Sequence, residues 1–135
     1  MSESGTMNKV ALVARILLGL VFFVFGLNGF LHFMKTPPNP AAGAAFMKAL
    51  AMTGYMFPLI KGTEVVAGLM LLSNRMVPLG LVLLAPILVN IAAFHIFLSP
   101  APAGMVMTAV LLGFEGFLAW YYRDYFRGVL TFKTH

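Results

Sequence analysis

Long apolar runs separated by short polar or proline-rich stretches dominate this chain, and the first extends from about Val10 to Met34. A bilayer core of roughly 30 Å is crossed by about 20 helical residues, so this run is long enough to span. Backbone groups in hydrocarbon must find their hydrogen bonds within the protein, which restricts spanning segments to helices or closed barrels. The length of the run favours a helix, and the sequence therefore predicts an all-α integral membrane protein.

The composition argues against an ordinary soluble domain. Hydrophobic residues make up 61% of the 135 residues and charged residues only 10%, whereas soluble domains contain about 25% charged residues. The net charge of +5 is distributed in ones and twos at segment ends. This distribution indicates contacts with membrane lipids and no binding of nucleic acid. The chain contains no cysteine, so it can form no disulfide and can run no thiol chemistry of its own.

The fold class predicted is an integral membrane four-helix bundle with a short interfacial helix between spans one and two. Prolines interrupt the helix over 35–41, and the apolar segment that follows, 42–52, is too short to cross the membrane. The predicted ranges are a polar N-terminal tail at 1–9, a membrane domain at 10–127 with spans at about 10–34, 57–72, 77–98 and 105–122, and a C-terminal tail at 128–135.

Small residues and one proline predict details of helix packing. Gly19 and Gly26 share a face of span one, and Ala109 and Gly113 form a small-residue pair in span four. Such positions let two helices approach closely in a membrane. Pro86 is expected to kink span three, because it removes one backbone hydrogen bond.

Basic residues predict the orientation. With four spans, both termini and the turn between spans two and three share one side of the membrane. That side holds Lys9, Arg15, Arg75, Arg123, Arg127 and Lys133, whereas the other holds Lys35 and Lys48. Lys and Arg concentrate in cytoplasmic segments. The sequence thus predicts a multi-pass plasma-membrane protein with both termini in the cytoplasm.

Charged groups inside a predicted span are the first candidates for a functional site. Lys61 and Glu64 lie three positions apart in span two, so they share a helical face and can neutralise each other. Each charge costs a few kcal/mol in hydrocarbon, and ionisable residues inside a membrane therefore point to a functional site. A structural alternative is an ion pair that locks two helices together.

Further polar residues occur at similar depth in the other spans. At about 1.5 Å per residue, Asn28, Glu64 and Asn90 lie roughly 9 to 12 Å from the outer ends of spans one, two and three. His32 and His95 lie closer to the outer surface, and Glu115 lies deeper, near the midplane. Glu115 either meets a cation of another helix or carries a proton, because an unpaired carboxylate is costly in hydrocarbon.

Several chemistries fit this polar layer. A quinone head could accept a hydrogen bond from a histidine and a proton from a carboxylic acid. His32 and His95 come from different spans and could ligate a haem, or could hold a metal together with a carboxylate. The structural alternatives are asparagines that hydrogen-bond between helices and histidines that lie at the membrane interface.

The pattern of residues in four places resembles the DoxX-like family of small four-helix integral membrane proteins. The resemblance covers about residues 10–127. Its signature residues are Leu17-Leu18-Gly19 with Asn28-Gly29, Lys61-Gly62-Thr63-Glu64 with Ala67-Gly68, Pro86-Ile87 with Asn90 and His95, and the aromatic and basic end of span four.

This resemblance implies a four-span bundle in a bacterial inner membrane. Some relatives are linked to thiosulfate:quinone oxidoreduction, and others to oxidative-stress complexes or chaperone-like assembly. The chain lacks the additional domain expected of a complete thiosulfate-oxidising assembly. A redox role would therefore be confined to the quinone-side membrane part.

The sequence leads to one hypothesis and one alternative. The hypothesis is a buried polar site in the outer half of the bundle that binds a quinone or another lipophilic ligand in a redox-linked role. The catalytic candidates are Glu64, His95 and Glu115, and the cofactor-binding candidates are Asn28, His32, Lys61 and Asn90. In the alternative, a non-catalytic membrane subunit or chaperone-like assembly factor, the polar layer only fixes helix packing. The expected partners are membrane lipids and a protein partner or a second copy of the chain.

Overall fold

A computed structural model describes residues 3–35 and 38–133 of the chain. All regular structure within these ranges is helical, which confirms the all-α prediction. Four helical stretches are long and apolar enough to cross a membrane, and they occupy Gly5–Leu31, Met56–Ser73, Val77–Leu98 and Pro102–Tyr121. They correspond to the four spans predicted from the sequence.

Five α-helices and two short irregular turns make up the described chain. The α-helices are α1 (Glu3–Leu31), α2 (Ala41–Met52), α3 (Met56–Ser73), α4 (Val77–Ala93) and α5 (Pro102–Tyr121). A π-helical turn, η1 (Phe94–Leu98), continues α4, and a 3-10 turn, η2 (Arg123–Phe126), follows α5. Of the predicted proline-rich break at 35–41, residues 36–37 lie outside the described ranges.

The first helix differs most from its predicted bounds. It begins at Glu3, before the predicted start at Val10, and ends at Leu31, before Met34. Adding a residue to an existing helix needs no new nucleus, so the polar residues before the span continue its helix. Asn8 in this extension accepts a hydrogen bond from the Tyr121 hydroxyl, which ties it to the end of α5.

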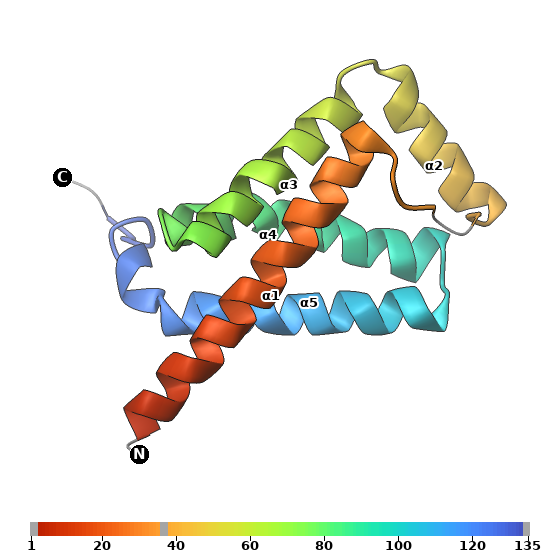
Figure 1. The fold of residues 1–135 in the computed structure, drawn as a ribbon. Coiled ribbons are helices and arrows are strands. Elements are labelled where there is room, and N and C mark those ends of the chain that lie inside the picture. Colours follow the sequence, from red (N-terminus) through yellow and green to blue (C-terminus); the bar gives the residue numbers. More distant parts are fainter. Residues whose placement is uncertain (1–2, 36–37, 134–135) are drawn as a thin grey trace.

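The four long helices pack in a ring in which each helix has two main neighbours. Helix α1 packs on α3 and α5, and α4 packs on the same two helices. Both chain termini lie at one end of the bundle, here called the terminal end (Figure 1). The opposite end, here called the α2 end, carries α2, which packs on α3 and η1. This is the predicted short helix between spans one and two.

Glycines bring α1 and α3 into backbone contact. A Cβ built on Gly68 would lie 2.7 Å from the backbone nitrogen of Phe23 and 2.8 Å from the carbonyl oxygen of Gly19. One built on Gly26 would lie 2.9 Å from the carbonyl oxygen of Lys61. The predicted close packing through span one is thus confirmed, because a side chain at these positions would meet main-chain atoms.

The expected close contact in span four is not formed. A Cβ built on Gly113 would meet nothing within 4 Å among the described residues, and Ala109 is exposed. The neighbours of α5 pack instead on the face that carries Leu111 and Leu118, both of which are buried. A pair of small residues permits a close approach but does not require one.

Arg15 caps the end of α3 at the terminal end. Its side chain is 7% exposed, and its guanidinium donates to the carbonyl oxygens of Leu71 and, at 3.5 Å, Leu72. The last carbonyls of a helix have no partner within it and attract cations. Burial raises the pKa of Tyr122, and the nearby Arg15 charge opposes this rise. The sequence analysis used Arg15 only to predict the orientation in the membrane. In the structure it also links α1 to the end of α3.

Candidate functional site

A pocket of about 380 Å³ lies at the α2 end, between α2, α3 and the last part of α4 with η1. Most of its lining is apolar, with side chains such as Phe57, Ile87 and Phe94. Its polar lining consists of Lys61, Glu64, Asn90 and His95. Four of the polar residues predicted from the sequence therefore meet in one pocket.

Lys61 and Glu64 form the charged part of this pocket. The Lys61 ammonium lies 3.2 Å from a carboxylate oxygen of Glu64, and Glu64 is only 3% exposed. The pair confirms that the two residues share one face of α3. Because both partners belong to α3, the pair does not by itself lock two helices together.

Gly29 gives the Lys61 side chain its room. A Cβ built on Gly29 would lie in contact with the methylene groups of Lys61. The lysine stem therefore packs on α1 while its ammonium turns to Glu64 in the pocket. This is how α1 influences the pocket without lining it.

The π-helical turn η1 places His95 between two pockets. Its imidazole lines the pocket just described and a smaller one of about 160 Å³ that includes Thr108 of α5. Nδ1 of His95 is buried and has no hydrogen-bond partner among the described residues. Single π-turns inside α-helices often occur at functional sites, because the extra residue re-aims a side chain.

Gly104 of α5 forms a close wall behind the His95 ring. A Cβ built on Gly104 would lie 2.6 Å from Cε1 and 2.7 Å from Nδ1 of His95. The Phe94 ring also meets the imidazole edge-on, at 5.4 Å between centroids. These contacts fix the ring plane, so the orientation of His95 depends on α5 as well as on η1.

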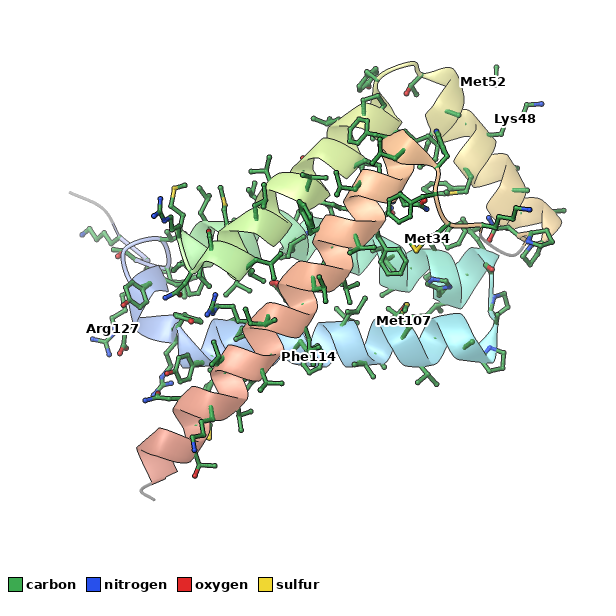
Figure 2. The ribbon with its side chains drawn as sticks, in the orientation of Figure 1. Met34, Lys48, Met52, Met107, Phe114 and Arg127 are labelled. Carbon is green, nitrogen blue, oxygen red and sulfur yellow. The ribbon has the colours of Figure 1, made fainter. Side chains whose placement is uncertain are left out.

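Helix α2 forms one wall of the pocket, a role that the sequence reasoning missed. Its Met47 and Leu50 side chains line the pocket, whereas Lys48 and Met52 lie on its outer side (Figure 2). The Phe46 ring packs on Phe94 at 5.8 Å between centroids. An apolar face next to a basic residue predicts an interfacial helix, but nothing in that pattern says that the face covers a cavity.

The pocket reaches the surface of the bundle along α4. Pro86 and Asn90 line it and are also exposed. Large exposed side chains of the same helices, such as Val66 and Val89, mark surface suited to contact with lipid acyl chains. Exposed apolar surface therefore lies next to the exposed part of the pocket lining.

Asn28 and His32 lie at the α2 end but do not line this pocket. Asn28 Oδ1 accepts a hydrogen bond of 2.7 Å from the backbone nitrogen of Met34, which stabilises the turn after α1. His32 is exposed and has a positive φ of 54° just beyond the helix end. Counting residues along a span predicts how deep a side chain lies in the membrane. It does not predict which neighbouring helix the side chain faces.

The haem and metal interpretations gain no support from this arrangement. His32 lines no pocket together with His95 among those described. Within residues 3–35 and 38–133, no group of three or more metal-ligating side chains comes together. His95 is thus the one histidine of the predicted pair that belongs to the pocket.

Glu115 lies in a different pocket, of about 320 Å³, toward the terminal end. That pocket is bounded by the first half of α4, the second half of α5 and the C-terminal segment. Glu115 is only 9% exposed. The predicted layer therefore divides into a charged pair with Asn90 and His95 in one pocket and a single acid in another.

These features define a small multi-pass membrane protein with a polar pocket between its spans. The chain belongs to the DoxX family, whose family model matches residues 10–98. The match includes α2, α3, α4 and η1, and with them every residue that lines the pocket at the α2 end. No curated protein and no solved structure matches the chain.

Proposed function

We propose that the pocket at the α2 end binds a lipophilic molecule with a small polar head, such as a quinone. The observation that carries this proposal is a mainly apolar pocket, partly exposed along α4, in which four polar side chains converge. Pockets of about 300 to 1,000 Å³ with apolar walls and few polar groups are typical ligand sites. The ligand tail would extend between α3 and α4 into the lipid.

The polar residues suit the two carbonyl oxygens of a quinone. Lys61 and Asn90 can donate hydrogen bonds to one oxygen, and the His95 imidazole can donate to the other. The carboxylate of Glu64 balances the positive charge of Lys61. The pocket therefore has no net charge from this pair, which suits an uncharged quinone head.

The redox part of the proposal concerns proton supply. Reduction of a quinone to a quinol takes up two electrons and two protons. His95 and Glu64 can pass on the protons, each taking one up from water before handing it to the quinone, and a partner protein with its own redox group would deliver the electrons. The chain would then be the quinone-binding membrane part of a larger assembly.

The location proposed is a bacterial inner membrane with both termini in the cytoplasm. The support is the excess of Lys and Arg in the segments of the terminal end. The pocket would then lie in the outer half of the membrane.

Because the chain has no native cysteine, single cysteines introduced at Ala49 and Ser73 can be compared. A membrane-impermeant maleimide should label Ala49→Cys in intact cells and Ser73→Cys only after lysis, and the reverse would overturn the orientation.

A non-catalytic subunit or assembly factor is the second candidate. It is favoured by the packing of the Lys61 stem against Gly29, which places the charged pair beside the seam between α1 and α3. In this case the pair serves folding, and replacing both charges by apolar side chains leaves function intact.

Extraction of the purified protein distinguishes the two candidates. The wild-type chain, purified in mild detergent, is extracted with solvent and its quinone is measured by mass spectrometry. We expect a stoichiometric quinone that is lost in Glu64→Gln combined with His95→Ala. His32→Ala is the matched control and should retain it, because His32 lies outside the pocket. A wild-type protein without quinone, or a double variant that retains it, would remove the proposal.

A further inference from the structure

The pocket toward the terminal end shares no residue with the pocket at the α2 end. Its walls are apolar side chains of α4, α5 and the C-terminal segment, such as Leu81, Ala119 and Leu130. Only Glu115 and Arg123 bring ionisable groups to it. The quinone proposal does not use this pocket.

Glu115 has no hydrogen-bond partner for one of its carboxyl oxygens. Its Oε1 is fully buried and unpartnered among the described residues, and more than nine-tenths of the residue is covered. Oε2 of Glu64 is also buried without a hydrogen bond, but it lies 3.2 Å from the Lys61 ammonium. The two buried carboxyl groups of the bundle thus differ in whether a cation accompanies them.

The cations near Glu115 are engaged elsewhere. Arg123 is exposed. It donates to the Trp120 carbonyl oxygen at 2.8 Å, and its guanidinium lies 4.7 Å from the centre of the Trp120 ring. Arg15 of α1 donates to the end of α3. Helix α4 contains no ionisable residue, and His95 of η1 lines the other pockets.

The remaining charged groups of the C-terminal segment also have partners or lie outside the pocket. Asp124 and Arg127 pair with each other at 3.0 Å, and both are strongly exposed. No cation among the described residues therefore neutralises Glu115. A proton is the one small cation that can do so without further ligands.

We propose that Glu115 is a proton-binding site that exchanges its proton at the terminal end through this second pocket. The pocket leads from the buried carboxyl group to the exposed C-terminal segment, where Val129 and Leu130 form its rim. The inference stands independently of the quinone proposal, because the two sites have no residue in common.

A lipophilic carbodiimide tests this inference, because it reaches apolar pockets and reacts with the protonated acid. The acid transfers its proton to a carbodiimide nitrogen, and its oxygen bonds to the central carbon. The resulting O-acylisourea rearranges to a stable N-acylurea, so the reaction is a simple addition. Dicyclohexylcarbodiimide is applied to the full chain in detergent, and the adduct is located by peptide mass spectrometry.

The expected result is one adduct at Glu115 whose rate of formation falls as the pH rises. Glu115→Gln should abolish it, and Glu64→Gln should leave it in place. An adduct on Glu64 but not on Glu115, or a rate that does not change with pH, would overturn the proposal.

A second pair of variants tests the route. Ala119→Leu narrows the pocket beside Glu115 and should slow labelling severalfold. Ala103→Leu, exposed near the start of the same helix, is the control and should label at the wild-type rate. Equal rates for both variants would show that the pocket is not the path to Glu115.

Discussion

Lys61 and Glu64 are each tolerated in the bundle because the other is present. An ammonium or a carboxylate alone at this depth would have no partner in lipid, and burying it would cost free energy. Pairing the two groups at 3.2 Å removes most of that free-energy cost. Asn90 and His95 share the pocket but belong to α4 and η1. The pocket therefore joins a neutral charge pair on one helix to hydrogen-bonding groups on the next.

Removing one charge of the pair should cost more than removing both. We expect Glu64→Leu to lower the stability by about 3 kcal/mol, because breaking a buried pair leaves an uncompensated charge. Adding Lys61→Met should restore most of that loss while quinone binding stays absent. Thermal denaturation in detergent and ligand extraction measure the two effects. Normal quinone content in the double variant would show that the charged pair is not part of the quinone site.

Gly104 should control ligand binding although it does not line the pocket. In Gly104→Ala the new methyl group would displace the His95 imidazole, whose Cε1 would otherwise lie 2.6 Å away. We expect weaker quinone binding with an almost unchanged melting temperature. Gly116→Ala, on the same helix and in open space, is the control. If both variants bind like the wild type, His95 does not contact the ligand.

The sequence could predict which residues are unusual but not which of them meet. Lys61, Glu64, Asn90 and His95 were found because polar groups inside apolar runs are conspicuous. Asn28 and His32 had the same signal, yet the first stabilises a turn and the second is exposed. Counting residues gives depth along a helix, whereas the direction of a side chain depends on how the helices are rotated.

At the scale of the helices, the seam between α1 and α3 is the closest in the bundle. Gly19 and Gly68 face each other there, so the two backbones pack without intervening side chains. The spacing of glycines in span one predicted this seam. The small-residue pair Ala109 and Gly113 of span four forms no such seam within the described chain, because a small residue permits close packing only where a second helix is present.

Two glycines of α3 should respond to alanine with opposite signs. Gly68→Ala places a methyl group 2.7 Å from the backbone nitrogen of Phe23, and overpacking of this kind costs about 1 to 3 kcal/mol. Gly62→Ala meets nothing within 4 Å and should stabilise the helix by roughly 0.5 to 1 kcal/mol. Apparent melting temperatures of both variants check this. If Gly62→Ala lost as much stability as Gly68→Ala, the close packing of α1 on α3 at Gly68 would not explain the loss.

Arg15 should be the most important cation for stability at the terminal end. Arg15→Met leaves the last carbonyls of α3 without a donor, and we expect a loss of about 2 kcal/mol, as for other hydrogen bonds to charged groups. The control Lys9→Met removes an exposed charge of the same helix and should change the stability little. Equal melting temperatures for the two variants would show that the cap contributes nothing.

The bounds of the elements were predictable to within a few residues, and the exceptions have local causes. Spans two and three agree closely with α3 and with α4 plus η1. Helix α1 starts early because its polar residues need no bilayer to remain helical. The π-turn at Phe94–Leu98 was not foreseen. This turn begins eight residues after Pro86, and the kink expected at Pro86 itself stays a prediction.

At the scale of the whole molecule, the bundle separates two sites along its length. The α2 end holds the open pocket with its charged pair, and the terminal end holds the buried acid behind the C-terminal segment. Helix α2 covers one side of the pocket at the α2 end, and Pro86 and Asn90 of α4 leave part of its lining exposed. This arrangement suits a ligand that arrives through the membrane.

Photoaffinity labelling with an azido-quinone tests the central claim most directly, because it reports where a quinone binds. The reagent is added to the membrane-embedded wild-type protein, and labelled peptides are identified with and without excess unlabelled quinone. We predict competed labelling within 47–64 and 86–95, the segments of α2, α3, α4 and η1 that line the pocket. Labelling that excess quinone does not reduce, or that falls on α1 and α5 instead, would contradict the assignment of this pocket.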